Sequence, residues 1–202
     1  MQGLLRAATA AIGLVATSAW ADSNFYVSAE AGITRYDSES AEYSDPFNDG
    51  SLSNESLDRS NRSRGAVFGF QWNPNWAVEA GYAHLGEYEY SADSSGAGLY
   101  AAGNLNSEVE YEGATLAVVY RIPLSNRFAL LTRLGAFDGS ARKTLSDANG
   151  KNTATDDVTE GFGGVGVDLR LTEDVSGELN YFYYSGDVGV NNLNMRVQFI
   201  LD

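Results

Sequence analysis

The sequence predicts an all-β protein: an eight-stranded antiparallel up-and-down transmembrane β-barrel. Eight stretches alternate apolar and polar residues at every second position, which is typical of strands with two different faces. Short turns alternate with long connections along the chain. The 202 residues include 22 Gly, 12 Tyr and nine Phe, a mixture of turn formers and strand formers. Beyond the N-terminal region no long stretch shows a helical period, and none is apolar enough for a membrane-spanning helix.

Charge and cysteine content exclude several classes of protein. The chain carries 27 acidic and 13 basic side chains, a net charge of −14, whereas a nucleic-acid partner needs clustered Lys and Arg. The absence of cysteine excludes a disulfide scaffold, a thiol nucleophile and any Cys-ligated metal. We therefore expect no nucleic-acid partner and no cofactor.

Residues 1–21 are predicted to be a secretory signal peptide. Arg6 supplies the positive charge, residues 7–17 are apolar, and Ala19-Trp20-Ala21 matches the small-x-small cleavage pattern. The apolar stretch is too short to span a membrane, which takes about 20 residues. We therefore expect a signal peptide at 1–21 and a mature barrel domain at 22–202.

Each predicted strand has one apolar face. The eight strands are expected at 25–33, 65–72, 76–85, 108–122, 128–137, 162–171, 175–184 and 193–201. Their apolar faces carry, in chain order, Phe25, Val27, Ala29, Ala31 and Ile33; Ala66, Phe68, Phe70 and Trp72; Trp76, Val78, Ala80 and Tyr82; Leu116, Val118, Tyr120 and Ile122; Phe128, Leu130 and Leu134; Val165, Val167, Leu169 and Leu171; Leu179, Tyr181 and Tyr183; Leu193, Met195, Val197, Phe199 and Leu201.

The connections between these strands differ in length. Residues 73–75, 123–126 and 172–174 are short and rich in turn formers. Residues 36–62, 86–107 and 138–160 are long, and 185–191 is intermediate. A barrel with tight turns at one rim and long loops at the other is the pattern of outer-membrane barrels. We expect both termini at the rim with the tight turns, on the periplasmic side.

The polar face distinguishes a membrane barrel from a soluble ligand carrier of the same topology. It carries Gly, Asn, Gln and charges of both signs, which suits a closed interior in which an unpaired charge would be costly. The predicted interior charge network is Glu30, Glu79, Arg121, Arg133, Asp168, Arg170, Glu178 and Arg196.

Aromatic residues lie near the ends of several predicted strands. Such residues form girdles at the two lipid–water boundaries of membrane barrels, although strand propensity alone also enriches aromatics. The predicted girdle residues are Trp72, Trp76, Tyr120, Phe128, Tyr181 and Tyr183.

The chain resembles the small Gram-negative outer-membrane β-barrel family, the OmpA-like and porin-like barrels. The segments that carry the resemblance are FYVSAEAG (25–32), GFQWNPNWAVEAGYAHLG (69–86), VYRIPLSNRFALLTRLGA (119–136), GVGVDLRLTEDVSGELNYFYY (164–184) and NMRVQF (194–199).

The resemblance implies a bacterial outer-membrane location, with outer-membrane lipid, lipopolysaccharide and the barrel-assembly machinery as partners. It also implies that the repeated Glu-x-x-Tyr step at Glu79 and Glu178 faces inward, with Arg133 and Arg196 as candidate partners. Family members usually end on an aromatic residue that the assembly machinery reads, whereas Phe199 is followed here by Ile200, Leu201 and Asp202. No peptidoglycan-binding segment is recognised, so a cell-wall tether is not expected.

Catalytic and metal-binding residues are sparse. The single histidine, His84, is followed two residues later by Gly86, where the lipid A deacylase type would have a serine. We therefore expect an interfacial histidine and no catalytic site. One histidine without cysteine argues against a transition-metal site. Asp45-x-x-x-Asp49-Gly50 partly matches a calcium loop but lacks ligands at Phe47 and Ser56, so a solvated loop is expected.

The sequence therefore predicts a monomeric outer-membrane barrel with a plugged polar interior and acidic extracellular loops. Surface loops on a rigid scaffold favour a structural or surface-interaction role. A narrow porin-like channel for small solutes remains the alternative, although eight strands enclose little more than their own side chains. A lipid A-modifying enzyme is the third hypothesis.

Overall fold

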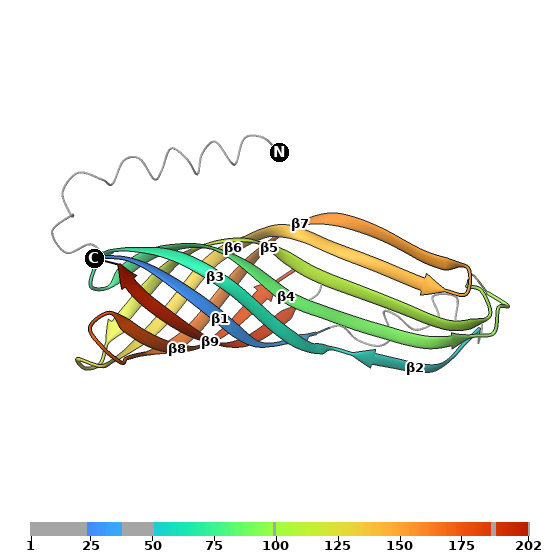
Figure 1. Ribbon diagram of the computed structural model, residues 1–202, viewed down its shortest axis with the longest axis horizontal. Coiled ribbons are helices and arrows are strands. Elements are labelled where there is room, and N and C mark those ends of the chain that lie inside the picture. Colours follow the sequence, from blue (N-terminus) through green and yellow to red (C-terminus); the bar gives the residue numbers. More distant parts are fainter. Residues whose placement is uncertain (1–23, 38–50, 99, 187–188, 202) are drawn as a thin grey trace.

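The computed structural model describes residues 24–37, 51–98, 100–186 and 189–201, and the described chain is almost entirely antiparallel β-structure (Figure 1). The predicted signal peptide lies outside the described residues, as do Asp45 to Asp49 of the first predicted loop. The strands are β1 (Asn24–Tyr36), β2 (Leu52–Asp58), β3 (Ser60–Asn73), β4 (Trp76–Ser94), β5 (Gly103–Pro123), β6 (Phe128–Asp147), β7 (Gly150–Arg170), β8 (Val175–Ser185) and β9 (Val190–Leu201).

The strands close into a ring. Each strand from β3 to β9 pairs with its neighbour in the chain, β1 pairs with both β3 and β9, and the β4–β5 pairing belongs to the same ring. Only Arg59 separates β2 from β3, and among the described strands β2 pairs with β4, so β2 prolongs β3. The ring therefore has eight strands when β2 and β3 are counted as one, which confirms the predicted architecture.

The prediction of long loops at 86–107 and 138–160 is wrong, because most of these residues continue the strands. β4 and β5 continue as a paired hairpin to Ser94 and Gly103, and β6 and β7 continue to Asp147 and Gly150. Within 36–62, the described residues 52–58 form β2. Figure 1 shows these hairpins projecting beyond the ring, away from the end at which β9 stops. The far rim is thus a twisted sheet with short tips.

A β-bulge explains why the alternating pattern of β4 breaks at residue 85 although the strand continues. The register shifts between His84 and Gly86, so that Leu85 and Gly86 are both buried. Gly86 has a φ of 82°, a conformation that glycine adopts without strain. Before the bulge the odd-numbered residues face inward, whereas after it Tyr88 and Tyr90 are the buried ones.

An apolar belt surrounds the ring on its outer face. Its large side chains have exposed fractions between 38% and 73%, and each of the eight ring strands contributes at least one of them. Soluble monomers rarely expose a continuous apolar surface that surrounds the molecule. About five outward residues on each strand correspond to a strand of 9–11 residues, the length that crosses a bilayer. Among the described residues no helix is long and apolar enough to cross a membrane.

A charge placed in this belt tests its contact with lipid. Leu134 is 73% exposed near the middle of the belt on β6, so Leu134→Arg should lower the free energy of unfolding by about 2–4 kcal/mol. The matched control, Asn104→Arg, lies exposed on the projecting part of β5 and should change it by about 0.5 kcal/mol at most. Urea unfolding in lipid vesicles, followed by Trp fluorescence, measures both. Equal effects would contradict a lipid-facing belt.

Candidate functional site

A buried ion network crosses the barrel interior at its middle. Arg133 on β6 lies 3.0 Å from Glu79 on β4 and 2.8 Å from Glu178 on β8. Arg196 on β9 lies 3.0 Å from Glu79 and 2.8 Å from Glu30 on β1. These strands are not all neighbours in the ring, so the ion pairs connect its opposite walls. All five side chains are at least nine-tenths buried.

Neutral side chains complete the hydrogen bonding of the network. Tyr26 donates its hydroxyl to Glu79 at 2.8 Å, and the guanidinium of Arg133 donates to Asn180 at 2.7 Å. Asn180 in turn donates to Glu178 and Asn194. A buried ion is tolerated only where its charge and its remaining polar atoms are matched. Side chains from several strands supply that match here.

A second ion pair lies toward the rim with the short turns. Arg121 on β5 contacts Asp168 on β7, whose side chain is fully buried. The structure therefore brings seven of the eight predicted interior charges into ion pairs. Arg170 is exposed near the turn between β7 and β8 and lies outside this network. Its parity is that of an interior residue, but β7 ends there, at the rim.

Two small cavities flank the central network. Each measures about 20 Å³, enough for roughly one water molecule. Gln71, Arg121 and Gln198 line the cavity on the short-turn side. Thr115, Phe162 and Tyr184 line the one on the side of the projecting hairpins.

Aromatic residues fill the interior toward the projecting hairpins, which sequence reasoning missed. Tyr36 and Phe137 are fully buried, and Phe162, Phe182 and Tyr184 pack beside them. The hydroxyl of Tyr36 donates to the carbonyl of Gly86 at the bulge, at 2.9 Å. The interior therefore carries an aromatic cluster toward this end, beside the buried polar side chains of Thr34, Ser63 and Asn192. The alternation of inward and outward residues could have found this cluster. Its members on β7 and β8 are even-numbered, as are the inward polar residues of those strands.

The predicted girdle residues occupy two levels of the outer face. Trp76 stacks on Trp72 and contacts Tyr120 across β4 and β5, beside the short turns. Phe128 is exposed at the start of β6, at the same rim. Tyr181 and Tyr183 are exposed on β8, nearer the opposite rim. Their role at lipid–water boundaries stays a prediction.

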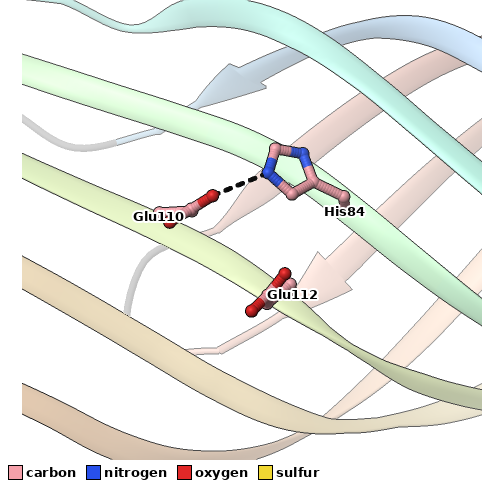
Figure 2. Close-up of side chains that lie close together, drawn as sticks. All are labelled: His84, Glu110 and Glu112. Atoms are coloured by element: carbon pink, nitrogen blue, oxygen red, sulfur yellow. Dashed lines mark hydrogen bonds and ion pairs between the residues drawn. The ribbon is translucent and has the colours of Figure 1, made fainter.

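A polar cluster on the outer face lies just above the belt. His84 on β4 and Glu110 and Glu112 on β5 bring their ligand atoms within 4.8 Å of one another, and Figure 2 shows the imidazole turned toward Glu110. The Nε2–Glu110 distance is 2.8 Å. Alternation alone could not bring these residues together, because the register between β4 and β5 sets their alignment.

This cluster favours a hydrogen-bonded histidine over a metal site. The amide of Gly86 donates to Nδ1 of His84 at 3.2 Å, which leaves the ring proton on Nε2, where it is donated to Glu110. A metal bound at Nε2 would require the ring proton to lie on Nδ1, where it would face the amide N–H of Gly86. Arg142 also lies 3.7 Å from Glu110 and 4.0 Å from Glu112, where it competes with a cation.

Comparisons with known proteins identify the family. The model of the OmpA-like transmembrane domain matches residues 20–198. The chain belongs to this family. This OmpA-like chain is 25% identical over 192 residues to outer membrane protein A of Salmonella typhi and to that of Shigella flexneri, 94% of its own length and 49% of theirs. It thus spans about half the length of the curated relatives it matches.

A solved structure agrees on the fold. The OmpA-like barrel superposes on Ail, the attachment invasion locus protein of Yersinia pestis, with a TM-score of 0.53 at 15% identity, over 89% of this chain and 97% of that one. The family match and these relatives locate the protein in the bacterial outer membrane.

The network predicts non-additive substitutions in this OmpA-like barrel. Glu79→Leu or Arg133→Leu alone leaves a buried charge with one partner fewer and should destabilise by about 3–5 kcal/mol. The double variant should lose less than either single one, because Arg196 keeps Glu30 and Glu178. Thermal unfolding in detergent measures all three, and simple additivity would contradict the coupling.

The outer-face cluster predicts weak metal binding. Zinc should bind the wild-type protein no more tightly than it binds His84→Gln, because the imidazole is held as a hydrogen-bond donor. Calorimetric titration of the refolded barrel makes the comparison. Stoichiometric zinc binding that disappears in the variant would establish a metal site instead.

Proposed function

We propose that the protein is a monomeric outer-membrane scaffold with a plugged interior, and that it presents an acidic surface outside the membrane in a structural or surface-interaction role. Residues 1–21 would be removed as a signal peptide, leaving the barrel at 22–202. The barrel-assembly machinery would insert it.

The observation that carries the plug is the central ion network. Arg133 and Arg196 connect carboxylates on opposite walls, and the two cavities beside them are each about 20 Å³. Hydrated solutes need a continuous wide path, which a cross-linked interior of this kind does not offer. The aromatic residues around Tyr36 and Phe137 add a second, apolar obstruction.

The projecting hairpins support the surface role. Outward carboxylates face each other directly across β4 and β5, Glu87 opposite Glu110 and Glu89 opposite Glu108. Like charges in register destabilise a sheet, so this arrangement is maintained at a cost to stability. A basic partner surface would relieve the repulsion, and the rigid ring would hold the hairpins in position for it.

A non-enzymatic role fits the sparse chemistry. His84 lies on the outer face and donates to Glu110. Gly86 stands where a nucleophilic serine would be needed two residues on. The acidic hairpins therefore offer an interaction surface rather than a catalytic site.

A narrow passive channel is the second candidate, because the two flanking cavities would join if Arg133 moved aside. Single-channel recording in planar bilayers separates the two functions. We expect the refolded wild-type protein to be silent, because the ion network and the aromatic cluster both obstruct the lumen. A steady wild-type conductance that changes in Arg133→Ala would favour the channel.

A further inference from the structure

Three arginines gather on the outer face just above the apolar belt. Arg35 on β1 and Arg62 and Arg64 on β3 are all exposed. In the β1–β3 register, Ile33 lies opposite Arg62 and Ala31 opposite Arg64. Residues two apart on one strand, and diagonal residues on paired strands, lie about 7 Å apart. The three guanidinium groups can therefore reach a single ligand.

Their height matches the headgroup region of the membrane. One step further toward the short turns, the same faces carry Ile33, which is 62% exposed, and then Phe68, which is 49% exposed. These side chains belong to the belt. Arginine at such a boundary lays its aliphatic stem along the apolar surface and keeps its charge among the headgroups.

These arginines have no acidic partner among the described residues. None of the ion pairs described for the chain includes Arg35, Arg62 or Arg64. The nearby carboxylates are engaged elsewhere: Asp37 accepts from Asn191, Glu87 from Asn61, and Asp58 from the amide of Ser60. By contrast, Arg142 at a similar height contacts Glu110 and Glu112.

A chain with 27 acidic and 13 basic side chains would repel phosphate over most of its surface. The arginine group is an exception, and along this row the first carboxylate lies two strands away, because Arg64 on β3 pairs with His84 on β4, which pairs with Glu112 on β5. Guanidinium groups bind phosphate oxygens in a bidentate manner. We propose that Arg35, Arg62 and Arg64 bind the phosphates of lipid A, the phosphorylated glycolipid of the outer leaflet.

The proposal is tested with the refolded barrel in detergent micelles and native mass spectrometry. The probes are lipid A with both phosphates and the same lipid after dephosphorylation. The variant Arg35→Gln/Arg62→Gln/Arg64→Gln is compared with Arg127→Gln/Lys151→Gln/Arg170→Gln. This control removes three exposed positive charges elsewhere, so both variants have the same net charge.

Each basic residue near an anionic surface contributes about a fivefold gain in affinity. The triple variant should therefore bind phosphorylated lipid A roughly a hundredfold more weakly, while the wild type and the control bind it alike. The dephosphorylated lipid should bind weakly to all three. Heat-modifiable migration on gels verifies folding, and if the triple variant fails to fold, Arg64→Gln alone should lose about fivefold.

Three results would overturn the proposal. Equal binding of lipid A by the triple variant and the control would remove the arginines from the site. Equal wild-type affinity for the two lipids would remove the phosphate. Displacement of lipid A by an excess of inorganic phosphate would indicate a site for a free anion instead of a lipid.

Discussion

Hydrocarbon cannot hydrogen-bond to a peptide group or solvate a charge, and this constraint governs the structure. It requires every strand of the ring to pair on both sides, which the closed order from β3 through β9 and β1 achieves. It also puts apolar side chains such as Leu134 and Met195 outside, where they are exposed. Charged side chains within the membrane must then face inward and find partners there.

The central ion network is the consequence of that inward placement. Glu79 receives hydrogen bonds from Arg133, Arg196 and Tyr26, so one carboxylate links strands from three parts of the ring. Removing a single member of such a network destabilises the barrel, because it leaves a buried charge with fewer partners. In the proposed scaffold the same contacts would also obstruct the lumen, so that stability and the absence of conductance would have one cause. The proposed function then lies on the outer surfaces.

The sequence predicted the membrane-crossing part well because there each face has a different solvent. Alternation located eight strands and their short turns, and it identified Glu79 and Arg133 as inward. It failed beyond the membrane for physical reasons. Residues 150–157 of β7 are exposed on both faces, so they carry no period although they pair with β6. The bulge before Gly86 inverted the parity of β4.

The candidate sites show the same limit. The contact of His84 with Glu110 depends on the register between β4 and β5, and the arginine group depends on the register between β1 and β3, neither of which alternation specifies. Arg170 has the parity of an interior residue, but it lies at the rim, where β7 ends. Finding contacts between strands distant in sequence thus needed the structure, whereas alternation alone predicted which face most residues occupy.

Thiol accessibility tests the closed lumen most directly, because the chain has no cysteine of its own. Gln71→Cys introduces a single thiol that lines the cavity on the short-turn side of the network. The barrel is inserted in sealed vesicles, and a small charged thiol reagent is added to one side at a time. Modification is expected only from the short-turn side. Equal modification from both sides would contradict a lumen closed by Glu79, Arg133 and Arg196.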